Sequence, residues 1–226
     1  MQSQLPLLIA AAMVVVLMLL AQRDHRRLRA SRRDLLGPCA HLLAEPQILH
    51  GGDDFPRLEG RHDGAPVRVE LIPDTMTIRR LPQLWLSVAT CTPLPGISGF
   101  AALVRPNGNE FYALAHRYPV RLEAPEGLPR EILINGESPE AQHLLDAIAP
   151  AAAAILADPR VKELAVTPKG IRIVRQAGEG RRGEHLLLRQ AVFDDAHVGA
   201  PDLEAILAAA AALRDAAPRK PHRVAA

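Results

Sequence analysis

Cysteine and aromatic residues are scarce in this chain. Its 226 residues include two cysteines, Cys39 and Cys91, whose wide spacing matches no paired metal-ligand motif. Two cysteines do not form a disulfide framework in a chain of this length, so we expect both thiols to be free. Aromatic residues make up 3% of the sequence, which disfavours stacking on single-stranded nucleic acid. The core must therefore be built mainly from leucine, isoleucine, valine and alanine.

The chain also lacks a strong excess of either positive or negative charge. The common catalytic motifs are absent too. The net charge of +2 is too small to indicate a nucleic-acid partner. The sequence contains no P-loop, dinucleotide fingerprint, His-Glu-x-x-His motif or nucleophile elbow. We therefore predict no cofactor, metal or catalytic residue from motifs. Only three of the 27 basic residues are lysines, and alanine, arginine and proline abound, a composition typical of a bacterial protein from a GC-rich genome.

What the chain does have is one long apolar run near its N-terminus. Residues 5–21 form seventeen consecutive positions without a charge. As a helix they extend about 25 Å, the short end of what crosses a hydrocarbon core of about 30 Å. A cleaved secretory signal is the alternative, but the first four residues carry no side-chain charge and no Ala-x-Ala follows the run. We predict a retained single-pass transmembrane helix.

The charge next to this run predicts its orientation. Six arginines follow the run within eleven residues, and none precedes it: Arg23, Arg26, Arg27, Arg29, Arg32 and Arg33. By the positive-inside rule, the N-terminus lies outside and the rest of the chain is cytoplasmic, at the bacterial inner membrane. We interpret the arginines mainly as a membrane-flanking basic segment. Binding of anionic lipid headgroups or nucleic acid is the alternative interpretation of the same residues.

After a basic helix that ends near Leu36, the pattern is that of antiparallel strands. We predict hairpins around His62-Asp63-Gly64 and around Pro106-Asn107-Gly108-Asn109, because such turns lie between alternating apolar segments. The predicted strands cover 57–61, 66–72, 84–91, 101–105, 110–115, 120–123 and 131–134. Together they predict a sheet of about six strands.

Helical periodicity begins at residue 138. Ser138-Pro139-Glu140 has the order of an N-cap, a first-turn proline and an early acid, and the apolar stripe runs to Asp158-Pro159. We expect Pro150 to kink or split this helix. A hairpin over 161–174, a strand over 185–193 and a helix over 201–216 follow. The predicted fold class is α+β: residues 1–36 are the anchor with its basic helix, 37–216 the cytoplasmic domain, and 217–226 a disordered tail.

Three segments contain residues capable of chemistry, although each has a plainer explanation. His50, Asp53, Asp54 and His62 lie near one another in the sequence and could hold a metal, but glycine and aspartate also suit ordinary turns. Cys91 could act with His116 or His143, yet a lone cysteine that ends a strand is more often packed. The loop 178–183 has the glycines and arginines of an anion cradle but lacks the ending of a P-loop. We favour the structural interpretation in all three.

Two alanine-rich segments, 151–154 and 208–212, permit close packing of helices, either within the domain or against a partner.

From the predicted anchor and the absence of motifs we expect a non-enzymatic, membrane-anchored protein whose domain binds or organises a protein partner. One alternative is a membrane-tethered, hydrolase-like enzyme that uses the His and Asp residues between 50 and 63. A periplasmic domain on an uncleaved signal anchor is the other.

Overall fold

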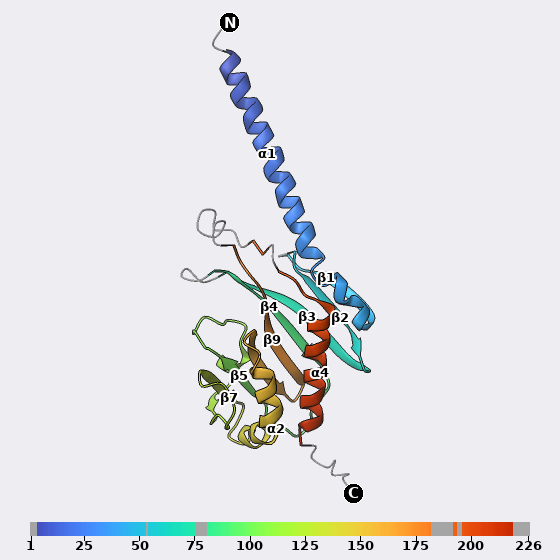
Figure 1. The fold of residues 1–226 in the computed structure, drawn as a ribbon, viewed down its shortest axis with the longest axis vertical. Helices are drawn as coiled ribbons and strands as arrows, with labels where there is room; N and C mark the ends of the chain where they lie inside the picture. The colour runs from blue at the N-terminus through green and yellow to red at the C-terminus, as the bar shows by residue number, and fades with distance from the viewer. Residues whose placement is uncertain (1–3, 53, 76–80, 182–191, 194–195, 219–226) are drawn as a thin grey trace.

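The structure is a computed structural model that describes residues 4–52, 54–75, 81–181, 192–193 and 196–218. One long helix, α1 (Gln4–Arg33), projects from an α+β domain built on a large antiparallel sheet (Figure 1). α1 and the C-terminal end of the last helix lie at opposite ends of the molecule (Figure 1). The predicted strand over 185–193 and the predicted tail fall largely outside the described residues.

The apolar run and the arginines that follow it form one continuous helix. α1 ends at Arg33, three residues before the predicted end, and the chain turns into a 3-10 helix, η1 (Gly37–Leu42). Pro38 occupies the first turn of η1, where its missing N–H is not needed. The early turn buries Leu36 and Cys39 completely, and the Cys39 thiol donates a hydrogen bond to the carbonyl of Val198 at 3.3 Å. α1 is thereby joined to the domain by a short, packed connection.

Nine strands, all antiparallel, form one sheet among the described residues. Their order across the sheet is β1-β2-β3-β4-β9-β8-β5-β7-β6. The bounds are β1 (Ala44–His50), β2 (Pro56–His62), β3 (Ala65–Asp74), β4 (Gln83–Thr90), β5 (Phe100–Val104), β6 (Val120–Arg121), β7 (Ile132–Gly136), β8 (Val161–Thr167) and β9 (Gly170–Glu179). β1 is not among the predicted strands, because it is exposed along its whole length and lacks alternating burial.

The hairpin at His62-Asp63-Gly64 is confirmed. Asp63 and Gly64 both have positive φ, at 49° and 75°, as the tight turn between β2 and β3 requires. The hairpin of β8 and β9 is confirmed as well. Gly170, at φ 144°, passes so close to the carbonyl of Thr90 that a Cβ there would collide with it.

The hairpin predicted around 106–109 is wrong. β5 pairs with β7 on one edge and with β8 on the other, so neither edge is available to a strand at 110–115. The chain instead turns at Arg105, whose φ is 50°, and residues 105–119 fold over the sheet with a short 3-10 helix, η2 (Leu114–His116). Five buried residues form a small second core between this segment and the sheet: Ala101, Leu103, Ala113, Ala115 and Ala165.

The two predicted amphipathic helices are confirmed as α2 (Ala141–Leu156) and α4 (Ala200–Ala216). Both lie on the same face of the sheet (Figure 1), where their apolar stripes form the main core with the strands. Pro150 neither splits nor ends α2. It is exposed on the outer side of the helix, where water can bond the carbonyl that loses its partner. The helix begins after Glu140 rather than directly after Ser138.

Candidate functional site: the anchor junction and the groove between α2 and α4

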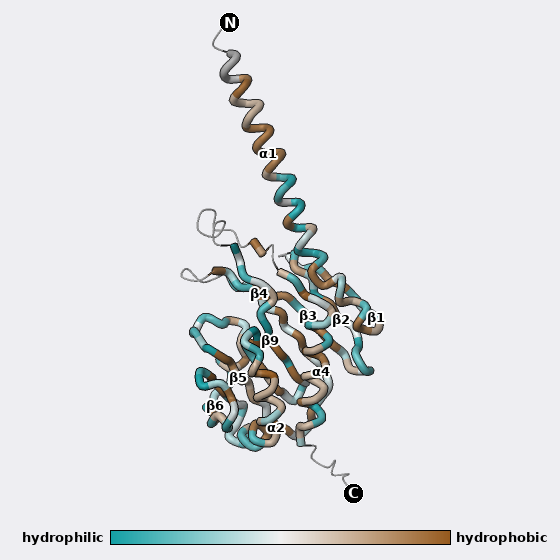
Figure 2. The backbone as a smooth tube through the Cα atoms, viewed as in Figure 1, coloured by the Kyte–Doolittle hydropathy of each residue, from teal (hydrophilic) through white to brown (hydrophobic). Residues whose placement is uncertain are grey.

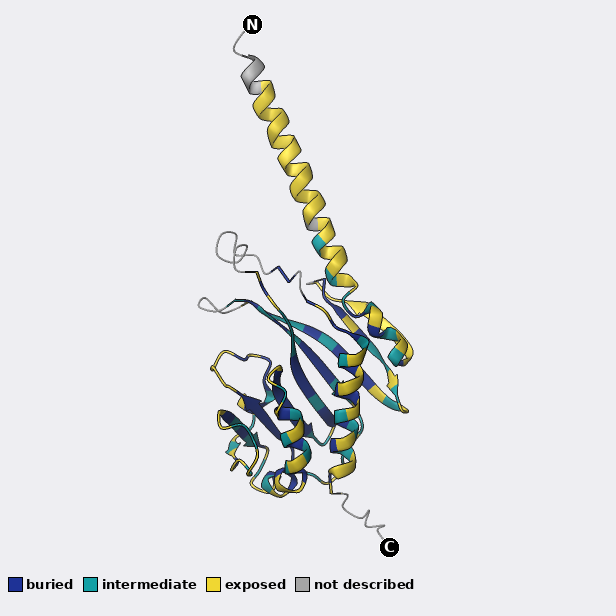
Figure 3. Ribbon diagram, in the orientation of Figure 1, coloured by how far each residue is buried: buried dark blue, intermediate teal, exposed yellow. Residues whose placement is uncertain are grey.

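α1 has two halves with different surroundings. The large apolar side chains from Leu8 to Leu20 are between 49% and 67% exposed, and this half of the helix projects away from the described part of the domain (Figures 2 and 3). Among the described residues, this is the one helix long and apolar enough to cross a membrane. Removing this apolar surface from water would be favourable, because burying each large side chain is worth about 1.5–3 kcal/mol.

The basic half of α1 is fixed to the domain by Asp54. Arg29 approaches the carboxylate at 3.0 Å and Arg33 at 2.8 Å, one guanidinium to each oxygen. Arg32, between them on the same side of the helix, lies over the ring of Phe55, 5.2 Å from the guanidinium carbon to the ring centroid. Phe55 packs edge-on against Phe193 in the domain. We call this set of contacts, made by residues 29, 32, 33, 54 and 55, the junction.

The surroundings of Asp54 favour its ionised form. Its φ of 63° turns the chain sharply, and its side chain is only 11% exposed despite the charge. The hydrogen bond from Arg33 holds the pKa of this carboxyl below its usual value, and the charges of Arg29 and Arg32 act in the same direction against the effect of burial. The junction is therefore intact at neutral pH and weakens only in strong acid.

The residues considered for metal binding or catalysis between 50 and 63 do not come together. His50 lies at one end of β1, where its Nε2 is 3.3 Å from the carbonyl oxygen of Arg33. His62 lies at the far end of β2 with its Nδ1 3.3 Å from the carbonyl oxygen of Leu42, so the length of a strand, about 20 Å, separates the two imidazoles. Asp53 lies outside the described residues. Within the described part of the chain, no group of three or more possible metal-ligating side chains occurs.

The other two candidates also receive structural explanations. Both thiols are free, as predicted. Cys39 is buried, but Cys91 is exposed, so the packed position expected for Cys91 is wrong. The loop predicted at 178–183 begins later than expected, because Gly178 and Glu179 belong to β9. The N–H of Gly180 donates to the carbonyl of Pro82 at 2.7 Å, and that of Arg181 to the carbonyl of Val192 at 3.0 Å. These two donors are not available to an anion.

A groove of about 360 Å³ lies between α2 and α4 on the outer side of the helical layer. Its walls repeat at helical spacing, at positions 151, 154 and 155 of α2 and positions 205, 209 and 212 of α4. All of these residues are alanine except Ile155. The two alanine-rich segments of the sequence thus pack next to each other, as the intramolecular interpretation predicts, and still leave an apolar hollow because methyl groups do not fill the space between the helices.

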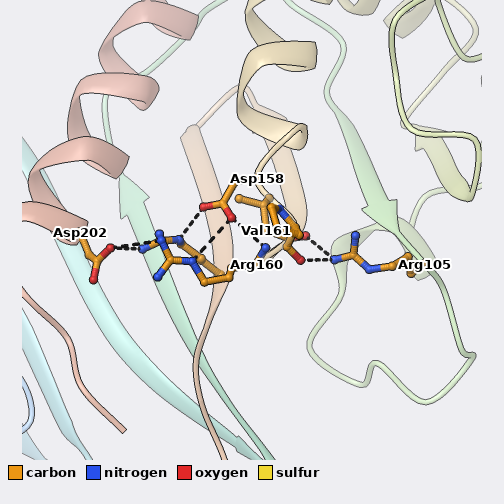
Figure 4. Close-up of polar contacts among 7 residues, drawn as sticks. Arg105, Asp158, Arg160, Val161 and Asp202 are labelled. Atoms are coloured by element: carbon orange, nitrogen blue, oxygen red, sulfur yellow. Dashed lines mark hydrogen bonds and ion pairs between the residues drawn. The ribbon is translucent and has the colours of Figure 1, made fainter.

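One end of the groove is closed by ion pairs. Arg175 of β9 donates from Nε to Asp158 at 2.8 Å and from Nη1 to Asp202 at 2.6 Å, and so ties the end of α2 to the start of α4. Arg160 lies 3.6 Å from Asp158 and 3.5 Å from Asp202 (Figure 4). On the other side of the same turn, Arg105 donates to the carbonyls of Pro159 and Val161 (Figure 4). The network holds the two walls of the groove together.

A second group of charges is buried on the opposite face of the sheet, beneath residues 105–119. Glu163 is completely buried and accepts hydrogen bonds from Arg172 at 3.2 Å and from the N–H of Ala115 at 3.1 Å. Burial raises the pKa of Glu163, although Arg172 and Ala115 oppose the shift. Arg172 also donates to Ser87 at 3.0 Å and to the carbonyl of Tyr112 at 3.0 Å. These bonds fix the covering segment onto the sheet.

Nearby, Lys162 forms a 2.8 Å ion pair with Glu110, and His116 lies 3.5 Å from the other oxygen of that carboxylate. Burial alone would raise the pKa of Glu110, but the bonds from Lys162 and from the N–H of Asn107 outweigh it and the pKa is lowered. These buried charges are not among the residues predicted from the sequence. The one available signal was the pair Lys162-Glu163 inside an otherwise apolar strand.

Comparison with known proteins adds no family. The sequence matches no model of a known protein family, and no curated protein matches it. The function must therefore be inferred from the junction, the exposed apolar helix and the groove themselves.

Proposed function

We propose that this chain is a single-pass protein of the bacterial inner membrane, with its N-terminus outside and its α+β domain on the cytoplasmic side. The domain acts as a binding module for a protein partner at the membrane. The observation that carries the proposal is the uniform exposure of the apolar half of α1, from Leu8 to Leu20, beside a junction that holds its basic half. A bilayer removes that apolar surface from water without any other change in the molecule.

The direction of insertion is supported by the asymmetry of charge around the span. Six arginines follow residues 5–21 and none precedes them. Fusions of alkaline phosphatase and of a fluorescent protein to the C-terminus test this directly in bacterial cells. We expect fluorescence without phosphatase activity. Phosphatase activity would instead place the domain in the periplasm and overturn the assignment.

The groove between α2 and α4 is the surface we assign to the partner. We propose that it receives the apolar face of a partner helix, because its walls are alanine and isoleucine side chains at helical spacing. Of the charged residues that line the groove, Asp158 and Asp202 are both paired with Arg175, so the rest of its surface is apolar. The apolar face of an amphipathic helix matches such a surface.

Two arginine substitutions on α4 test the groove. Ala205 lines it and Ala208 does not, and both are exposed positions of the same helix that tolerate a longer side chain. A photo-crosslinking residue at Ala212 of the full-length protein should form an adduct with one partner in cells. We expect Ala205→Arg to abolish this adduct and Ala208→Arg to leave it unchanged.

The identity of the adduct decides between occupants. A partner peptide with an amphipathic helix supports the proposal. An adduct with a second copy of this chain, an adduct that survives Ala205→Arg, or no adduct at all contradicts it. Circular dichroism and thermal unfolding of both variants provide the control that the fold is intact.

A further inference from the structure

The six arginines of α1 form two sets that lie on different sides of the helix. Arg23, Arg26 and Arg27 have the spacing i, i+3, i+4, and Arg29, Arg32 and Arg33 repeat the same spacing. At 3.6 residues per turn, each set occupies one side of the helix, and the centres of the two sets are about 120° apart. The sequence alone describes one basic run, whereas the helix separates it into two surfaces.

Among the residues that the structure describes, only the second set contacts the domain. Arg29 and Arg33 pair with Asp54, and Arg32 lies over Phe55. The side chains of the first set are exposed, and none of them has an ion pair or hydrogen-bond partner among the residues that the structure describes. Asp24 is the one acidic residue within this turn, so the turn remains net positive.

The two sets also lie at different depths relative to the apolar run. With a rise of about 1.5 Å per residue, residues 23 to 27 lie about 3–9 Å beyond Ala21, and residues 29 to 33 about 12–18 Å beyond it. The headgroup layer on each side of a bilayer is about 5–8 Å thick. The first set is therefore level with lipid phosphates, and the second set lies beyond them, where the domain begins.

We propose that Arg23, Arg26 and Arg27 form a binding surface for the headgroups of anionic phospholipids, while Arg29, Arg32 and Arg33 hold the domain at the junction. Arginine suits this role because its guanidinium can bond a phosphate with two parallel hydrogen bonds. The inference rests on the proposed membrane anchoring. It adds that the chain selects its lipid neighbours and does so independently of the junction.

The test measures lipid selectivity in full-length protein reconstituted into phosphatidylcholine bilayers. Spin-labelled phosphatidylglycerol or phosphatidylcholine is added, and the fraction of label immobilised at the protein gives the relative association constant of the two lipids. The matched variants are the triple substitution of Arg23, Arg26 and Arg27 by glutamine and the same substitution of Arg29, Arg32 and Arg33. Asp54→Asn opens the junction without changing either set.

We expect the wild-type protein to favour phosphatidylglycerol by about fivefold, the order expected for one arginine well placed at an anionic surface. The first triple variant should lose this preference, and the second triple variant and Asp54→Asn should keep it. No preference in the wild type, or an equal loss in both triple variants, overturns the inference.

Alkaline carbonate extraction of cell membranes separates this outcome from failure of the proposed function. If the wild-type protein is extracted, it has no membrane anchor and both proposals fail. If it resists extraction and shows no lipid preference, only the present inference fails.

Discussion

The two faces of the central sheet are covered by different kinds of contact. The face under α2 and α4 is covered by aliphatic side chains, and the ion pairs of Arg175 lie at its edge, with carboxylates about one-third exposed. The face under residues 105–119 buries the ion pair of Glu163 and Arg172 itself. Both arginines belong to β9, only three positions apart.

The difference follows from the backbone hydrogen bonding of the two elements that cover the sheet, the helices on one face and segment 105–119 on the other. A helix satisfies its own backbone, so it can cover a sheet with apolar contacts alone. The irregular segment 105–119 leaves backbone groups to be satisfied, and the buried charges bond some of them, namely the N–H of Ala115 and the carbonyl of Tyr112. We therefore expect the charged face to depend on complete pairing and the apolar face to depend on packing.

The largest expected effect is the loss of Arg172. Arg172→Met leaves the buried carboxylate of Glu163 without its cation, which costs about 3–5 kcal/mol of unfolding free energy. Urea unfolding of the full-length protein in detergent, followed by the fluorescence of Trp85, measures it. The double variant Arg172→Met/Glu163→Gln should recover most of the loss. A single variant as stable as the wild type would show that the ion pair does not hold the covering segment.

The stability lost in Arg172→Met should depend on pH. Arg172 opposes the rise in the pKa of Glu163, so its removal raises that pKa further. A carboxyl with a raised pKa destabilises the folded state only once pH exceeds its unfolded value of about 4.3. The loss in Arg172→Met should therefore be smaller at pH 4.5 than at pH 7.5. A loss that does not change with pH would argue against Glu163 as its origin.

A packing change on the other face should cost somewhat less. Leu164 follows Glu163 along β8, points to the helical layer and is completely buried. Leu164→Ala removes its contacts and leaves a cavity, at a cost of about 3 kcal/mol. This cost should not change between pH 4.5 and pH 7.5, and the contrast with Arg172→Met tests the comparison of the two faces.

Arg175→Met should have a smaller effect than Arg172→Met, although it breaks two ion pairs. Asp158 and Asp202 retain access to water, so solvent screening limits the cost to about 1 kcal/mol. Salt at 0.5 M should reduce the difference from the wild type, because the two carboxylates are partly exposed and salt screens them. A loss as large as that of Arg172→Met would show that the groove end is as tightly coupled as the buried pair.

The smallest effect on stability is expected at the junction. Asp54→Asn removes the anion that binds Arg29 and Arg33, and we expect the unfolding of the domain to change little while α1 reorients. Spin labels at Ala21 and Cys91 should report a broader distance distribution, and Asp63→Asn, at an exposed turn, is the control. Because the pKa of Asp54 is lowered, the wild type should keep the narrow distribution above pH 4 and lose it only as pH falls through that lowered pKa. Identical distance distributions for the wild type and Asp54→Asn at pH 7 would show that Asp54 does not hold α1 against the domain.

Local pattern determined much of this protein. The apolar run, the α+β class, the turn at Asp63-Gly64, the hairpin of β8 and β9 and the two amphipathic helices follow from periodicity and turn chemistry, which act between neighbours in the sequence. The strand β1 and the conformation of segment 105–119 could not be predicted from local pattern. The first has no alternating burial, and the second carries a turn signal that the occupied edges of β5 override.

Only the tertiary structure decided how the charges are used. In the sequence, six arginines form one run, and Asp54 is one of several aspartates in a turn-forming segment. Helix geometry separates the arginines, and contacts across more than twenty positions select Asp54 as the partner of Arg29 and Arg33. Likewise, Glu163 and Arg172 meet because two strands pair in one register and a distant segment covers them. Such pairings depend on which surfaces the fold brings together, and no local pattern in the chain encodes them.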